Sequence, residues 1–74
     1  MSLARVPTAS RFRVTAVRPG HEMTYRLMEM GFMEGAEIEL IRRAPLGDPL
    51  QVRIGDYELS IRAREAELVD VAAI

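Results

Sequence analysis

Apolar and polar residues alternate in several short stretches of the chain, and this alternation predicts β-strands. In residues 11–17, Phe12, Val14 and Ala16 alternate with arginine or threonine, as in a strand that buries one face. The Pro19-Gly20 pair that follows is a strong turn signal and ends this strand. Similar alternation predicts further strands over residues 37–43 and 68–71.

The clearest local pattern lies between residues 50 and 61, where two alternating segments flank Gly55-Asp56. A two-residue turn containing glycine predicts a tight hairpin. The resulting register sets Arg53 opposite Glu58 on the outer face, where opposite charges favour the pairing. On the inner face it pairs Ile54 with Tyr57, Val52 with Leu59 and Leu50 with Ile61, so that all six are expected to point inward.

Between the first two strands the period changes to that of a helix. Met23, Leu27 and Met30 fall at i, i+4 and i+7, which predicts a short helix over residues 22–30 with one apolar face. Gly31 follows at the position where helices favour a residue in the left-handed conformation.

The remaining segments connect these elements. Residues 1–10 have no clear period and are expected to form an extended, partly frayed lead-in. Residues 44–49 read as a loop rich in proline and glycine, and residues 64–67 as a single helical turn. The sequence therefore predicts one domain over residues 1–74: a mainly β, small, partly open barrel of about five strands, with one short helix after the first strand.

Composition narrows the classes of function. All ten basic residues are arginine, but eleven acidic residues offset them to a net charge of −1. A near-neutral chain has no broad basic surface for nucleic acid. No apolar run approaches the length that spans a bilayer, and no cysteine is present for a disulfide or a thiolate metal site. We therefore expect a cytoplasmic protein that neither inserts into the membrane nor binds nucleic acid.

Residues suited to catalysis or to metal binding are sparse. His21 is the one histidine, and no acidic residue accompanies it at a telling spacing. Four methionines near the helix could bind soft copper, but methionine at helical spacing is typical of core filling. The sequence therefore predicts no catalytic residues, no cofactor and no specific Fe(II) site, and favours a protein that acts by binding a partner.

A few apolar residues lie where the core does not obviously need them. Leu46 stands between Pro45 and Gly47 in the loop, and Phe32 and Met33 follow the helix. One interpretation is that these side chains fold back over the ends of the barrel. The other is an exposed apolar patch that binds a partner protein. The candidate partner-binding residues are Phe32, Met33, Arg42, Arg43, Leu46 and Asp48.

Several of these segments resemble the ferrous iron transport protein A (FeoA) family, over about residues 11–71. The most specific match is Arg42-Arg43-Ala44-Pro45-Leu46-Gly47-Asp48-Pro49, which is similar to a strand-loop-strand segment of that family. Residues 26–32 resemble the family's helix, and residues 57–62 its closing hairpin. Two departures are Glu34, where the family often has proline, and methionines in place of helix leucines.

The resemblance implies an SH3-like barrel and a role that composition does not show. It implies a small cytosolic accessory protein that binds and modulates a FeoB-type membrane ferrous iron transporter with a GTP-binding domain. The alternative is a regulatory SH3-like module of a metal-dependent transcriptional repressor system, since similar domains are appended to such repressors. Either protein would be a monomer or a weak homo-oligomer, and the direction of its effect on transport stays open.

Overall fold

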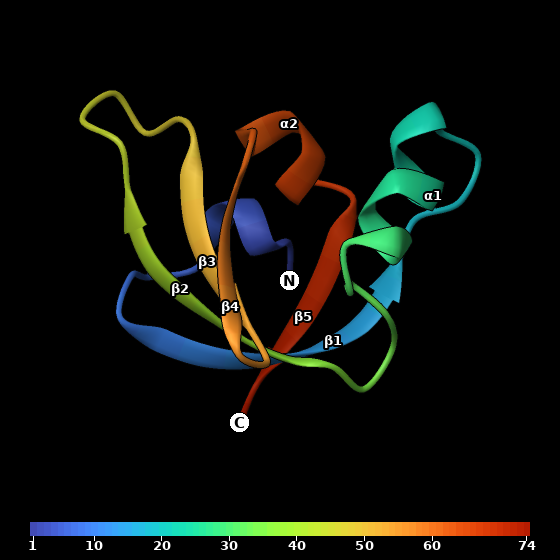
Figure 1. Ribbon diagram of the computed structural model, residues 1–74, viewed down its shortest axis with the longest axis horizontal. Coiled ribbons are helices and arrows are strands. Elements are labelled where there is room, and N and C mark those ends of the chain that lie inside the picture. Colours follow the sequence, from blue (N-terminus) through green and yellow to red (C-terminus); the bar gives the residue numbers. More distant parts are fainter.

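Five antiparallel strands form one curved sheet in the computed structural model, which describes residues 1–74. The sheet order is β4-β3-β2-β1-β5. Two short α-helices and one 3-10 helix lie on the concave side of the sheet (Figure 1). The elements in chain order are η1 (Leu3–Arg5), β1 (Ser10–Val17), α1 (Glu22–Glu29), β2 (Glu37–Arg43), β3 (Leu50–Ile54), β4 (Tyr57–Ile61), α2 (Ala63–Ala66) and β5 (Val69–Ala73).

This architecture confirms the mainly β, partly open barrel that the pattern predicts. β2 has the expected bounds, and α1 ends one residue before the expected last one. The final strand is shifted toward the C-terminus, over Val69–Ala73. The expected single turn after the hairpin is the helix α2, in which the Glu65 side chain accepts a hydrogen bond from the Arg62 amide at 2.8 Å.

The β3–β4 hairpin has the predicted register, including Arg53 opposite Glu58. Gly55 has a φ of 58°, which suits the first position of a two-residue hairpin turn. This register places the six apolar residues on one face of the hairpin, as predicted, but it does not bury all of them. Tyr57 is 50% exposed, and its hydroxyl donates a hydrogen bond to the carbonyl of Met30 at the end of α1. Leu59 is half-buried.

The first strand departs from simple alternation. Phe12 and Val14 are buried as predicted, but Ala16 is exposed. The pairing of β1 with β5 shifts register between Val14 and Ala16, as at a β-bulge. A bulge adds one residue to a strand and so reverses the faces beyond it. Val17 therefore packs against the core in place of Ala16.

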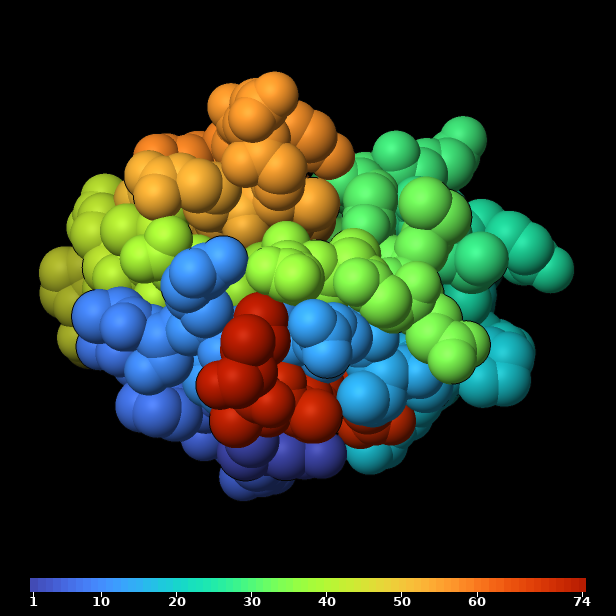
Figure 2. Space-filling view, turned by 90° about the horizontal axis from the view of Figure 1, so that it is seen from below, coloured from blue at the N-terminus to red at the C-terminus, as the bar shows by residue number.

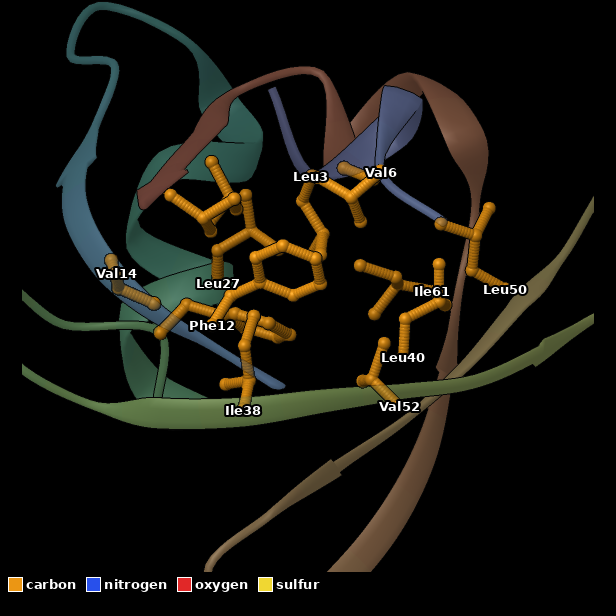
Figure 3. Packing of buried hydrophobic residues seen from close by; sticks show 14 of the residues in the cluster. Leu3, Val6, Phe12, Val14, Leu27, Ile38, Leu40, Leu50, Val52 and Ile61 are labelled. Carbon is orange, nitrogen blue, oxygen red and sulfur yellow. The ribbon is translucent and has the colours of Figure 1, made fainter. Parts of the chain in front are cut away.

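The N-terminal residues are part of the core, so the expected frayed lead-in is wrong. Leu3 and Val6 are both buried. Ser2 begins η1 by accepting a hydrogen bond from the Ala4 amide at 3.2 Å, and it pairs with Asp70 beside β5. Figure 3 shows Leu3 and Val6 among the side chains that fill the core between the sheet and the helices. A small domain gains core area in this way.

None of the helices is long and apolar enough to cross a membrane.

Candidate partner-binding surface

The loop between β2 and β3, residues 44–49, presents one apolar side chain to solvent. Leu46 at its tip is 98% exposed. The tip is a tight turn, in which the Gly47 amide donates to the Ala44 carbonyl at 2.7 Å. The Ala44 amide in turn donates to the Pro49 carbonyl at 2.9 Å and closes the base of the loop. Backbone hydrogen bonds before and after Leu46 therefore fix the loop in a conformation that exposes its side chain.

Asp48 fixes this loop to the helix α2. Its carboxylate accepts a hydrogen bond from the Ala63 amide at 3.0 Å and lies 3.8 Å from the guanidinium of Arg62. An acidic side chain that accepts a bond from the first amide of a helix stabilises that terminus. Asp48 thus has a structural role beside its predicted place in a contact surface.

The two arginines before the loop differ in their surroundings. Arg43 is half-buried, and its guanidinium donates to the Val6 carbonyl at 2.7 Å, which ties the loop to the N-terminal segment. Arg42 is exposed and donates to the side chain of Gln51 at 2.9 Å. Neither arginine forms an ion pair. Their positive charge is therefore not neutralised by an acidic neighbour within the chain.

Phe32 is not part of an exposed surface, so its predicted contact role is wrong in the folded domain. It is fully buried. The Phe32 amide donates to the Leu27 carbonyl and the Gly31 amide to the Met28 carbonyl, both at 3.0 Å. These are the two bonds of a Schellman motif, which commonly buries the apolar residue after the glycine. Gly31 has the required positive φ of 109°.

The candidate residues therefore do not form one patch. The loop 44–49 and the turn after α1 lie at opposite ends of the long axis of the molecule (Figure 1). Met33 is 53% exposed, but it belongs to the end that carries α1. What remains of the predicted patch is Leu46 with Arg42, Arg43 and Asp48 around its loop.

A second apolar area near Met33 is missing from the sequence prediction. Tyr25 and Met28 are 76% and 42% exposed, and a hollow next to Met28 is lined by Met28, Met33 and residues 15–17 of β1. Both residues lie outside the i, i+4, i+7 face that packs on the core. Their positions in the sequence could have predicted this exposure, because apolar residues that lie off the inward face of a helix remain in solvent.

Charged residues on the outer face of the sheet form cross-strand pairs. Arg53 donates to Glu58 at 2.6 Å and to Glu39 at 3.1 Å. The hydrogen bond from Arg53 holds the pKa of Glu58 below its ordinary value. No group of three histidine, cysteine or acidic side chains is placed to hold a metal ion. His21, the one histidine, is exposed.

The open five-stranded barrel, whose β2–β3 loop projects an apolar tip, has the features of a small SH3-like domain. The FeoA domain model matches residues 1–73, so the chain belongs to the FeoA family, which is linked to ferrous iron transport. A curated Fe(2+) transport protein A/Fe(2+) transporter FeoB fusion protein of Porphyromonas gingivalis is 34% identical over 74 residues. That match covers 100% of this chain and 9% of the length of the relative.

Solved structures agree with this assignment. Iron(II) transport protein A of Clostridium thermocellum is 36% identical with a TM-score of 0.92, covering 100% of this chain and 46% of that one. FeoA of Stenotrophomonas maltophilia, solved with zinc and described as a prokaryotic SH3 domain protein, is 32% identical with a TM-score of 0.86. It covers 97% of this chain and 89% of its own. The SH3-like fold is thereby confirmed.

The same fold is found in a different class of protein. A manganese-dependent transcriptional repressor has a TM-score of 0.89, covering 100% of this chain and 41% of its own, at 12% identity. At that identity the likeness shows a shared fold alone.

Proposed function

We propose that this domain binds the cytoplasmic part of a FeoB-type ferrous iron transporter and modulates its activity, without catalysing a reaction itself. The observation that supports this most is the relative in which an iron transport protein A and FeoB are one polypeptide. A covalent link keeps two domains at high effective concentration, which favours contact between them. In separate chains, the same contact needs a surface with its own affinity.

The loop 44–49 has the physical properties of such a surface. Its backbone bonds and the contacts of Asp48 order the loop before binding, so less conformational entropy is lost when a partner docks. Leu46 would be the buried anchor of the interface. Arg42 and Arg43, which no carboxylate neutralises, favour a partner with an apolar socket and an acidic rim.

A regulatory module of a metal-dependent repressor system is the second candidate. The manganese-dependent repressor shares the fold, but at an identity of 12% that likeness does not by itself support a common role. The two candidates predict different genomic neighbours. A neighbouring gene for a large membrane GTPase supports the transport role, and a neighbouring repressor gene without such a GTPase supports the regulatory one.

A pull-down against the cytoplasmic domains of the transporter tests the proposal. We expect the wild-type chain to be retained and Leu46→Asp to be lost, because a carboxylate cannot be buried unpaired in an apolar socket. Its thermal midpoint should hardly change, since Leu46 is 98% exposed. Met33→Asp is the matched control, because it places the same charge on an exposed residue at the opposite end.

Two outcomes contradict this account. Retention of Leu46→Asp at the wild-type level would remove the loop from the interface. Loss of Met33→Asp with Leu46→Asp retained would move the interface to the end that carries α1.

A further inference from the structure

The two edge strands of the sheet, β5 and β4, differ in whether other residues cover them. Beyond β5, the N-terminal residues cover the strand: Ser2 pairs with Asp70, and the Val71 amide donates to the Met1 carbonyl at 2.7 Å. In Figure 2 the dark blue N-terminal residues lie against the red C-terminal strand, whereas the orange hairpin stands at the margin of the molecule. β4 pairs with β3 and has no strand on its other side.

The open edge of β4 presents unpaired backbone groups. A two-residue hairpin closes with a hydrogen-bonded pair, here Ile54 with Tyr57, so the amides and carbonyls of Glu58 and Ser60 point away from β3. None of the backbone hydrogen bonds outside the regular elements uses these groups. Glu58 and Ser60 are both exposed. The edge is therefore available to another strand.

A charged side chain on an edge strand often prevents a second strand from pairing with it. On β4 the charged side chain is Glu58, and it is turned toward β3. The Glu58 carboxylate accepts hydrogen bonds from Arg53 at 2.6 Å and from Gln51 at 2.7 Å, both on β3. These bonds hold the carboxylate over the outer face of the hairpin. Neither a proline nor a free charge blocks the approach of a second strand to β4.

We propose that β4 pairs with β4 of a second copy of this chain, antiparallel, about a two-fold axis at Leu59. In this register Glu58 lies opposite Ser60 of the second copy, and each such pair exchanges two backbone hydrogen bonds. The half-buried Leu59 side chains of the two copies meet at the axis. The result is a continuous sheet through both molecules, with an isologous contact that closes as a dimer.

The charges beside the strand fit the same register. Asp56 forms no ion pair within the chain, and it falls opposite Arg62 of the second copy. The Arg62 side chain is 60% exposed and lies 3.8 Å from Asp48, so it can reach a second carboxylate. The symmetry produces this pair of opposite charges twice.

The neighbouring registers are disfavoured. Centring the axis on Glu58 would place two carboxylates opposite each other, which is destabilising. Centring it on Ser60 would leave only the central Ser60 pair to exchange hydrogen bonds, because each flanking pair would join Glu58 to the backbone of Arg62. That backbone is already used, because the Arg62 amide donates to Glu65 at 2.8 Å and its carbonyl accepts from Ala66 at 3.0 Å. The register centred on Leu59 is therefore the one that remains.

The pairing of β4 with a second copy does not depend on the proposed binding of the transporter.

Oxidative cross-linking tests the axis, since the chain contains no cysteine of its own. Leu59→Cys places two thiols opposite each other at the axis, within reach of a disulfide after small adjustments. Leu46→Cys is the control, because its thiol is far more exposed but lies off the axis. We expect Leu59→Cys to form covalent dimers several-fold faster. A faster reaction of Leu46→Cys would overturn the proposal, since collision alone would then set the rate.

Charge reversal with sedimentation equilibrium provides a second test that does not alter Leu59. Wild type should shift toward twice its 8.3 kDa mass as concentration rises. Asp56→Arg should abolish this shift, and adding Arg62→Asp should restore it by exchanging the two charges. Glu34→Arg, an equal change of charge at an exposed site distant in the sequence, should leave it unchanged. A wild-type chain that stays monomeric throughout, or an Asp56→Arg variant that still dimerises, would refute the β4 pairing.

Discussion

The turn after α1 and the loop between β2 and β3 both place an apolar residue beside a glycine, with opposite outcomes. Phe32, after Gly31, is fully buried, whereas Leu46, before Gly47, is 98% exposed. At Gly31 the helix ends in a Schellman motif that directs the next side chain into the core. At Gly47 a short turn hydrogen-bonds to itself and leaves the tip outside. The backbone motif around a loop residue, more than its apolarity, decides whether it is available to a partner.

Truncation of the two side chains is the strongest test of this comparison. Phe32→Ala should lower the free energy of unfolding by about 3–5 kcal/mol, because it empties a site in the packed core. Leu46→Ala should change it by no more than about 0.5 kcal/mol, as for other exposed positions. Chemical denaturation of both variants measures the difference. Similar values for the two would show that Leu46 caps the barrel and is not free to bind.

The N-terminal segment is a second region in which an apolar residue is buried although the sequence pattern predicts exposure. The pattern predicts a frayed segment over residues 1–10, but Leu3 is buried. Leu3→Ala should destabilise the fold by about 2–5 kcal/mol, since Leu3 is fully buried in the core cluster. Pro7→Ala, at an exposed neighbouring position, is the control. A Leu3→Ala variant as stable as wild type in urea denaturation would mean that the segment is not docked in solution.

The two glycines offer a smaller and more local test. Gly31→Ala and Gly47→Ala both force an L-residue into a positive φ, which costs about 1–2 kcal/mol. A Cβ at Gly31 would also lie 3.0 Å from the Tyr57 hydroxyl and 3.3 Å from Ile54, whereas one at Gly47 would meet nothing within 4 Å. We therefore expect the larger drop in thermal midpoint for Gly31→Ala. Equal drops would show that the crowding at Gly31 relaxes freely.

Most of the fold could be predicted because its signals are local. Alternation in residues 50–61 with a glycine turn fixes the hairpin register, and the periodicity of α1 identifies its inward face. The burial of Leu3 and Val6 could not be predicted in this way, because it depends on contact with β5, far away in the sequence. The bulge after Val14, which exposes Ala16, also arises from pairing with β5.

The candidate site could be predicted only in part. Leu46 is exposed as the contact interpretation requires, and the positions of Arg42, Arg43 and Asp48 follow from its loop. For Phe32 the sequence leaves both interpretations open, and the structure supports the one in which it folds back over the core, after the Schellman motif at Gly31. The grouping of the two ends into one patch failed for a different reason, since the distance between two loops depends on the curvature of the whole sheet.

The smallest expected effect concerns Glu58. Arg53 lowers its pKa in the folded state, so this carboxyl binds a proton less tightly when folded than when unfolded. Its contribution to stability is therefore present at neutral pH and is lost as the pH falls through the folded-state pKa. An NMR titration should give a Glu58 pKa below the ordinary value, and Arg53→Gln should raise it. An unchanged pKa in Arg53→Gln would contradict the pairing.

We propose that the partner is bound by the end of the domain that carries Leu46 and not by the end that carries α1. The most direct measurement is an NMR titration of the isotope-labelled domain with the cytoplasmic part of the transporter. We expect the largest shifts or line broadening on residues 42–48, with Tyr25, Met28 and Met33 little affected. Perturbations centred on Tyr25, Met28 and Met33, with the loop unchanged, would contradict it.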